Sequence, residues 1–337
     1  MTDAAGEWRQ AVHQASQATL AHAPEWFVAI RNAYGHVPMY FAAEDEAGRR
    51  GLLPAFVVRR PLFGTVVASM PFLDCGGPCS ASAPLDASLI EHLLCAARRL
   101  RARAVHLRCT QRLPIAVEPM EHKVLLTLAL PEDPEHVWRR LDASARNKVR
   151  KAERCGLSIA FGGVEHLPEF YQVFSARMRD LGSPVHSVAF LRAVLEGFGV
   201  RARIGLVRIG RTPIGGLVTV AFKDTLAVPW AACLKDYFPL GPNMLLYWET
   251  IRAACADGFR RFDFGRSSRH SGTYRFKRQW GAHEEPLFWY TIPIRPAARL
   301  PASASTSAEG TLTALWQRLP LPLTRTIGPR IRKYLIQ

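Results

Sequence analysis

Three apolar runs separated by short polar turns lie in the middle of this 337-residue chain. The runs cover residues 203–209, 214–222 and 225–232, and the dipeptides Gly210-Arg211 and Lys223-Asp224 stand between them. Apolar runs joined by such turns predict successive β-hairpins. We therefore expect a largely antiparallel meander flanked by helices, which is an α+β fold and not a doubly wound parallel sheet.

The rest of the chain alternates short strands with amphipathic helices, and its length predicts two domains, each a mostly antiparallel mixed sheet flanked by helices. We expect these domains over residues 1–134 and 135–296, followed by a linker over 297–311 and a basic amphipathic tail over 312–337. The other predicted strands are residues 39–42, 51–58, 65–68, 105–108, 123–130, 157–161, 261–264 and 287–292, and the predicted helices are 87–101, 135–155, 167–181, 188–198 and 243–257.

Composition restricts the classes of partner only weakly. Apolar residues make up 48% of the chain and charged residues 21%, which is typical of a folded globular protein. The formal charge of +16 favours a polyanionic partner, but only seven of the 44 basic residues are lysine, and a biased genome also produces an arginine excess. Seven scattered cysteines lack the paired spacing of a zinc site, so we expect reduced thiols and no metal.

The first 17 residues lack the basic start and apolar core of a secretory signal. No apolar run reaches the ~20 residues that cross a bilayer. These absences predict a cytoplasmic protein, and we expect a monomer.

The most basic predicted helix covers residues 135–155 and is expected to end at Gly156. One side carries an apolar stripe, and the other carries Arg146, Arg150 and Lys151. This face predicts contacts to a phosphate-bearing substrate, with an ordinary solvated helix face as the alternative.

Residues 260–281 begin as a short strand and continue into a loop with two glycines, several hydroxyls and many cations, and aromatic residues are interleaved with the cations. Backbone N–H groups and guanidinium groups of such a loop suit phosphate, although a solvated basic loop has a similar composition. Elsewhere the chain has no Walker A loop, no dinucleotide fingerprint, no G-x-S-x-G elbow and no H-E-x-x-H helix. Hydrolase and metalloenzyme classes therefore lose their usual support.

Several stretches resemble FemAB-like proteins of the GNAT superfamily, especially the branch associated with PEP-CTERM and exosortase systems. The resemblance covers residues 26–292, and its motifs are 263–267 (DFGRS), 271–281 (SGTYRFKRQWG), 146–153 (RNKVRKAE), 181–186 (LGSPVH), 69–72 (SMPF) and 76–77 (GG). It implies two tandem GNAT-like domains and, in better understood members, transfer of an amino acid from aminoacyl-tRNA to a peptidoglycan precursor.

The same resemblance implies that Lys277, which follows Phe276, lies at the reaction centre. An ammonium group there would stabilise charge on the leaving oxygen or hold a phosphate. Asp263 is a candidate base, with capping of the following loop as the alternative. The expected substrate-binding residues are Arg146, Arg150, Lys151, Arg266, Arg269, Arg275, Tyr274, His186 and His270. A structural role is an equal alternative for His186, whereas His270, among hydroxyls and cations, has a better claim to the site.

The chain has no R/Q-x-x-G-x-G/A pyrophosphate loop, so we expect no CoA or other cofactor. The expected function is an acyl or aminoacyl transfer, with a phosphate-bearing envelope or polysaccharide precursor as acceptor and aminoacyl-tRNA as one possible donor. An acyltransferase using acyl-CoA or an acyl-carrier protein is the first alternative. The second is a non-catalytic basic adaptor that binds RNA or a membrane.

The tail after residue 312 mixes leucines and isoleucines with arginines. This composition favours peripheral contact with the inner face of the cytoplasmic membrane, although three prolines interrupt the segment. A segment docked on the first domain is the alternative.

Overall fold

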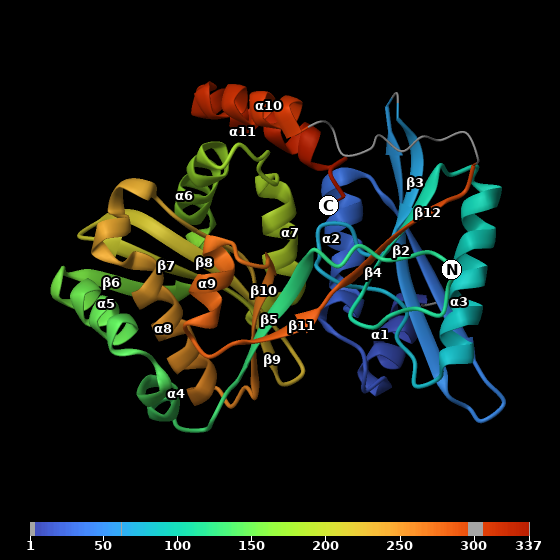
Figure 1. The fold of residues 1–337 in the computed structure, drawn as a ribbon, viewed down its shortest axis with the longest axis horizontal. Coiled ribbons are helices and arrows are strands. Elements are labelled where there is room, and N and C mark those ends of the chain that lie inside the picture. The colour runs from blue at the N-terminus through green and yellow to red at the C-terminus, as the bar shows by residue number, and fades with distance from the viewer. Residues whose placement is uncertain (1–3, 62, 296–305, 337) are drawn as a thin grey trace. The chain divides into compact units, whose positions relative to one another are not determined.

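The computed structural model describes residues 4–61, 63–295 and 306–336. The chain divides into two compact units: the first comprises Met1–Val124, Glu285–Ala302 and Lys333–Gln337, and the second comprises Leu125–Glu284 and Ser303–Arg332. Each unit combines a sheet with helices (Figure 1). The predicted α+β class is therefore confirmed.

The first unit contains a five-stranded sheet in the order β1-β2-β3-β4-β12. Its neighbouring strands are antiparallel except for β3 and β4, which are parallel and are connected through helix α3. A core that includes Leu53, Val67, Leu93 and Leu107 lies between α3 and the sheet. The elements are α1 Ala4–Gln14, η1 Leu20–His22, α2 Glu25–Tyr34, β1 Val37–Glu44, β2 Arg50–Arg60, β3 Gly64–Ala68, α3 Ala83–Arg99, β4 Ala104–Cys109 and β12 Phe288–Pro293.

The second sheet has seven strands in the order β11-β5-β10-β9-β8-β7-β6. Both predicted hairpins are confirmed, because Ile209 pairs with Thr212 and Phe222 pairs with Thr225. The turn residues Gly210 and Lys223 have φ values of 55° and 53°, as two-residue hairpin turns require.

Helices flank this second sheet, and several of them carry the candidate site. The elements are β5 Lys123–Ala129, α4 Glu135–Arg140, α5 Ala143–Arg154, β6 Leu157–Gly162, η2 Val164–His166, α6 Leu167–Asp180, α7 Val188–Phe198, η3 Gly199–Arg201, β7 Ala202–Ile209, β8 Thr212–Phe222, β9 Thr225–Cys233, η4 Lys235–Leu240, α8 Pro242–Ala256, β10 Arg261–Ser268, α9 Gly272–Arg278, β11 His283–Pro286, α10 Thr306–Arg318 and α11 Leu321–Arg332.

The prediction of one continuous helix over residues 135–155 is wrong. Leu141 and Asp142 adopt extended backbone angles, with ψ values of 143° and 150°, and they separate α4 from α5. Aspartate is a favourable residue at the start of a helix. Arg146 Nη1 donates hydrogen bonds to the carbonyls of Leu141 and Arg139, the latter at 3.3 Å, and so satisfies carbonyl groups that the break leaves open.

The units also differ from the expected ranges 1–134 and 135–296. Strand β12, which those ranges assign to the second domain, pairs with β4 of the first sheet. Strand β5 lies within the expected first domain but joins the second sheet. Apolar periodicity predicts that a segment forms a strand. It does not predict which of the two sheets the strand joins, because that depends on the strand with which its backbone groups form hydrogen bonds.

The C-terminal helices are docked on the second unit. Helix α10 begins at Thr306, within the expected linker, while residues 297–305 of that linker lie outside the described residues. Helices α10 and α11 pack on α6 (Figure 1). Arg325 Nε donates to Ser175 Oγ at 2.8 Å, and Gln317 Nε2 donates to the carbonyl of Asp180 at 2.9 Å. These contacts show that the helices of the tail are docked, but on α6 of the second unit and not on the first domain as the alternative expected.

No helix of the described chain is long and apolar enough to cross a membrane. All seven cysteines are free thiols, as expected. Cys79, Cys109, Cys233 and Cys255 are buried, whereas Cys95 is exposed.

Deleting residues 306–337 should lower the melting temperature, because the deletion removes the polar contacts on α6 and exposes the apolar surface beneath α11. A loss of about 2 kcal/mol corresponds to a decrease of about 3 °C in a protein of 337 residues. Differential scanning calorimetry would measure it. The double variant Leu312→Ser/Leu315→Ser is the control, because these side chains are 65% and 59% exposed. An unchanged melting temperature after the deletion would contradict the docking.

Candidate functional site

Strands β9 and β10 form a short parallel ladder in the second unit. They pair over three positions, from Arg261 with Thr225 to Asp263 with Ala227, and the ladder ends there. Asp263 Oδ1 accepts a hydrogen bond from the N–H of Gly265 at 2.7 Å, and Gly265 has a φ of 74°. Glycine suits this left-handed conformation. The Asp263 carboxylate therefore organises the loop-like bend in β10, as the capping alternative predicted.

Each strand is followed by a helix that begins beyond the ladder. After β9, the chain turns at Gly241 and starts α8 at Pro242. Gly241 has a φ of 76°, and a Cβ atom there would lie 3.2 Å from the carbonyl oxygen of Lys148 in α5. After β10, the Ser271 hydroxyl accepts from the N–H of Tyr274 and caps α9. The start of α8 therefore lies close against α5.

A groove of about 410 Å³ lies where α5, α8 and α9 meet. Lys148 and Lys151 contribute the cationic side, and Phe276 contributes an aromatic side chain. The other lining residues come from the connection between β9 and α8, its first turn and α9, and they are Phe238, Pro239, Gly241, Pro242, Asn243, Met244 and Gln279. Figure 1 shows the three helices that carry this groove.

The electrostatics of the groove favour an anion. Both lysines are exposed, and the amino end of the 15-residue helix α8 carries a partial positive charge. Asn243 lies in the first turn of α8, and its side-chain amide makes no hydrogen bond with any described residue. Phe238, Met244 and Phe276 add apolar surface. The arrangement suits a ligand with a phosphate beside an apolar or aromatic group.

Lys277 and Phe276 have different environments. Phe276 lines the groove and packs edge-to-face on Tyr247, with 5.0 Å between the ring centroids. Lys277 is only 8% exposed, and its Nζ donates to the carbonyls of Gly265 and Arg266 at 2.9 and 2.8 Å. The ammonium group therefore anchors α9 to the bent end of β10.

Two of the other expected residues near α9, Tyr274 and Arg269, share the Glu284 carboxylate as a partner. Tyr274 Oη donates to Glu284 at 3.0 Å, which raises the pKa of Tyr274, and Arg269 Nε lies 3.4 Å from the same carboxylate. Arg266 is half-buried in β10. The Arg275 side chain is exposed and makes no hydrogen bond or ion pair with the described residues. His270, with a φ of 64°, occupies the tight turn before α9.

The three basic residues predicted to act together on α5 separate in the structure. Arg146 satisfies carbonyls at the end of α4, and the Arg150 guanidinium lies 5.6 Å from the centroid of the Trp138 ring. Only Lys151 lines the groove, together with Lys148. Lys148 and Asn243 are thus site residues that the prediction did not include. The signals were the i, i+3 spacing of the lysines and the Gly-Pro start of α8.

His186 is not part of the groove. It is buried, with an exposed fraction of 2%, and packs against Phe190 and Trp230. Its Nε2 accepts a hydrogen bond from Arg332 Nε of α11 at 3.1 Å. The histidine is therefore a contact for the docked C-terminal helix, as the structural alternative predicted.

Residues 139–278 match the family model described as an acetyltransferase (GNAT) domain. No match was found among curated proteins. The chain is similar to the crystal structure of FemX, with a TM-score of 0.64 and 12% identity over 87% of this chain and 97% of FemX.

Two further structures are similar over most of their length. The C-terminal domain of an Agrobacterium fabrum protein assigned as a lysylphosphatidylglycerol synthetase has a TM-score of 0.56 and 13% identity, over 86% of this chain and 92% of that domain. A tandem GNAT protein from the clavulanic acid biosynthesis pathway has a TM-score of 0.52 and 10% identity, over 87% of this chain and 95% of that protein.

The second unit is therefore a GNAT-type transferase domain, and the whole chain has a tandem GNAT fold. The family-model match identifies an acyltransferase-type domain in the second unit, and the similarity of the fold to FemX agrees with the predicted resemblance to FemAB-like proteins of the GNAT superfamily. The association with PEP-CTERM and exosortase systems stays a prediction.

The stability of the second unit should depend on the protonation of His186. Burial, with a smaller contribution from Arg332, lowers the pKa of His186 well below 6.5. Below pH 6.5 the unfolded chain then binds more protons than the folded chain. The stabilising effect of a neutral His186 is therefore present above pH 6.5 and is lost as the pH falls toward the lower, folded-state pKa.

Melting temperatures between pH 7 and pH 5 would test this dependence. His186→Gln should reduce the decrease, since a glutamine oxygen can still accept from Arg332 and does not titrate. His283→Gln, which changes an exposed histidine of the same unit, should retain it. Part of the decrease in melting temperature should persist in every variant, because two histidines of the first unit also titrate. Burial lowers the pKa of His36 and lowers the pKa of His106 to about 4. Identical pH profiles for His186→Gln and His283→Gln would refute the assignment.

Proposed function

We propose that the protein transfers an acyl or aminoacyl group from a phosphate-bearing donor to an amine or hydroxyl of a cell-envelope precursor. The observation that supports this proposal is the groove at the start of α8, where Lys148 and Lys151 accompany an apolar wall that includes Phe276. The groove lies at the carboxyl ends of β9 and β10, beyond the point where they separate. Ligands of sheets with parallel strands commonly bind at such edges.

The connection between β9 and α8 favours a donor other than CoA. A pyrophosphate loop presents consecutive backbone N–H groups to the ligand. Here Pro239 and Pro242 lack an N–H, and Gly241 is the only glycine in the connection. Lysine side chains would then hold the phosphate of the donor. They suit the phosphodiester groups nearest the acylated 3′ end of an aminoacyl-tRNA. The chain is also similar in fold to a protein assigned as a lysylphosphatidylglycerol synthetase. Because the name of that protein refers to a lysyl group, this similarity also favours an aminoacyl donor.

The reaction requires attack of the acceptor nitrogen or oxygen on the carbonyl carbon of the donor. A new C–N or C–O bond forms, the C–O bond to the donor breaks, and the proton of the nucleophile ends on the released hydroxyl. We assign Lys277 to the stabilisation of negative charge near the leaving oxygen, because it follows Phe276 of the groove in the Phe-Lys pair that the resemblance to FemAB-like proteins places at the reaction centre. Electrostatic stabilisation of this kind depends on a rigidly held charge, and the two carbonyls hold Lys277.

A thioester donor on an acyl-carrier protein is the second candidate, since the phosphate of its prosthetic arm has the same charge as the proposed ligand. The acceptor could be an envelope or an exopolysaccharide precursor. We place the reaction at the cytoplasmic face of the membrane, where the exposed Leu312 and Leu315 of α10 and the arginines of α11 would contact anionic lipids. Loss of vesicle binding in Leu312→Ser/Leu315→Ser would support that location.

The product identifies the reaction. Mass spectrometry of envelope precursors and exopolysaccharide from cells with and without the gene should show a species that carries one additional acyl or aminoacyl group only when the gene is present. Identical precursor masses in the two strains would contradict the proposed transfer.

The double variant Lys148→Gln/Lys151→Gln should weaken donor binding. Each charged hydrogen bond to a phosphate contributes about 1.5–3 kcal/mol, so we expect KM for the donor to rise at least about tenfold with little change in melting temperature. Lys235→Gln is the matched control, because Lys235 is an exposed lysine of the same unit that does not line the groove. A KM equal to that of the control would exclude the groove as the phosphate site.

Lys277→Ala should reduce kcat strongly and also lower the melting temperature, because it leaves two buried carbonyls without their charged donor, at a cost of about 1.5–3 kcal/mol each. Kinetics should be measured well below the melting temperature of the variant. Lys277→Arg keeps a positive charge and separates the two roles. If Lys277→Arg retains the melting temperature and full activity, the charge alone suffices; if Lys277→Ala retains full kcat, the lysine is structural only.

A further inference from the structure

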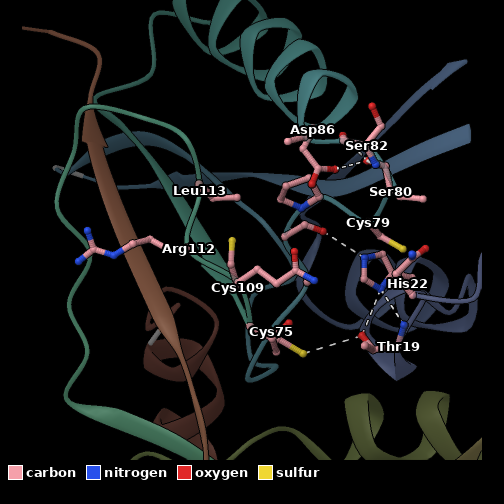
Figure 2. Close-up of a pocket in the computed structure, with 18 of the residues that line it drawn as sticks. Thr19, His22, Cys75, Cys79, Ser80, Ser82, Asp86, Cys109, Arg112 and Leu113 are labelled. Atoms are coloured by element: carbon pink, nitrogen blue, oxygen red, sulfur yellow. Dashed lines mark hydrogen bonds between the residues drawn. The ribbon is translucent and has the colours of Figure 1, made fainter. Parts of the chain in front are cut away.

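The first unit has a pocket of its own at the start of α3. Its volume is about 330 Å³, and all of its lining residues belong to the first unit (Figure 2). Strands β3 and β4 are parallel but pair at only two positions, Val67 with Val105 and Ala68 with His106. The pocket lies beyond the carboxyl ends of these strands, lined by the segments that lead into α3 and out of β4. This is the position in a β-α-β unit where ligands commonly bind.

One side of the pocket is acidic and hydroxylated. Asp86, in the first turn of α3, accepts a hydrogen bond at Oδ1 from the Ser80 hydroxyl at 2.7 Å. Burial raises the pKa of Asp86, so the carboxylate is partly removed from water. No described residue donates to its other oxygen, Oδ2. Asp86 therefore has one acceptor atom available to a ligand.

The opposite side is a fixed, neutral wall. His22 Nδ1 lies 3.1 Å from the N–H and from the hydroxyl of Thr19, and Nε2 lies 3.1 Å from the carbonyl of Gly77. The Nε2 atom must donate to that carbonyl, so Nδ1 accepts and the ring is a neutral tautomer. Figure 2 shows Thr19, His22 and Cys75 across the pocket from Asp86.

The pocket contains no cation suited to an anionic ligand. Arg112 Nη2 donates to Glu118 at 3.0 Å and to Glu121 at 3.1 Å. Figure 2 shows its side chain extending away from Asp86. The remaining polar groups include the side chains of Gln17, Thr110 and Gln111, which make no hydrogen bond with any described residue. The pocket therefore offers a carboxylate, amides and hydroxyls, and an anion would be repelled.

We propose that this pocket binds a neutral sugar ring, with Asp86 accepting hydrogen bonds from ring hydroxyls and Thr110 and the two glutamines completing the contacts. Sugar hydroxyls both donate and accept, which matches a set of carboxylate, amide and hydroxyl groups. The volume is at the lower end of the range for small-molecule pockets, about 300–1,000 Å³, and suits one ring. The further inference that this sugar is part of the acceptor rests on the proposed transferase function. The inference that the pocket binds a sugar does not.

Saturation-transfer NMR on the full-length protein would test this binding with glucose and N-acetylglucosamine as probes. Asp86→Asn keeps the acceptor for Ser80 but removes the charge, and it should raise the sugar Kd about tenfold, as expected for one charged hydrogen bond. Glu91→Gln changes an exposed carboxylate on the same helix α3 and should leave Kd unchanged. If Asp86→Asn fails to fold, Thr110→Val takes its place, with an expected rise of about two- to tenfold.

Alkylation of Cys75 provides a second measurement at the pocket itself. Cys75 lines the pocket and is half-buried, whereas Cys95 is exposed on the outside of α3. Bound sugar should slow the reaction of Cys75 with iodoacetamide, followed by peptide mass spectrometry, and leave that of Cys95 unchanged.

Three results would overturn the proposal. The first is no saturation transfer to either sugar, and the second is equal sugar Kd values for Asp86→Asn and Glu91→Gln. The third is saturation transfer to ethanolamine but not to the sugars, which would show that the Asp86 carboxylate binds an ammonium group instead. Failure of the transferase proposal is distinguishable. Lys148→Gln/Lys151→Gln should bind sugar as the wild type does. A protein that binds sugar but transfers nothing would refute the proposed function and leave the pocket assignment intact.

Discussion

The short ladder between β9 and β10 determines the geometry of the groove. If the two strands stayed paired to their ends, the segments after them would meet above a closed sheet, with no space between α8 and α9. The ladder instead ends at Asp263, where the carboxylate binds the N–H of Gly265 and the chain takes a left-handed turn. Lys277 then fixes α9 to the displaced end of β10. The same residues that end the ladder thus position Phe276 at the groove.

Charge is distributed unevenly between the groove of the second unit and the pocket at the start of α3 in the first unit. The groove of the second unit has two exposed lysines at the amino end of a helix, whereas the pocket of the first unit has a carboxylate at the start of α3 and its only arginine is paired with two glutamates. Both occupy the same position in a β-α-β unit with a short parallel ladder. The two cavities therefore differ in electrostatic character, as the proposed transfer between two different substrates would require. The total charge of +16 says nothing about this division.

Local patterns predicted the elements better than the site. The hairpins at Gly210 and Lys223 and the end of α5 at Gly156 follow from turn chemistry, which acts over a few residues. The roles of Arg146 and His186 could not be predicted in this way. Arg146 donates to carbonyl groups that are free to accept only because α4 ends before Leu141. His186 is covered by α11, through a contact with Arg332, which lies 146 residues further along the chain. Residue type indicates what a side chain can bind, but its partner depends on tertiary packing.

The exchange of strands explains why the chain does not divide at its central prolines. A fragment that ends near residue 134 would keep β5 but lack β12, so the hydrogen-bonding edge of β4 would be open along the six positions from Cys109 to Ala104. A fragment that begins there would lack β5 between β10 and β11. Each fragment would expose an unpaired edge strand, which promotes aggregation. Neither half of the sequence therefore contains all the strands of its sheet, because β12 returns to the first sheet and β5 leaves the first half for the second sheet.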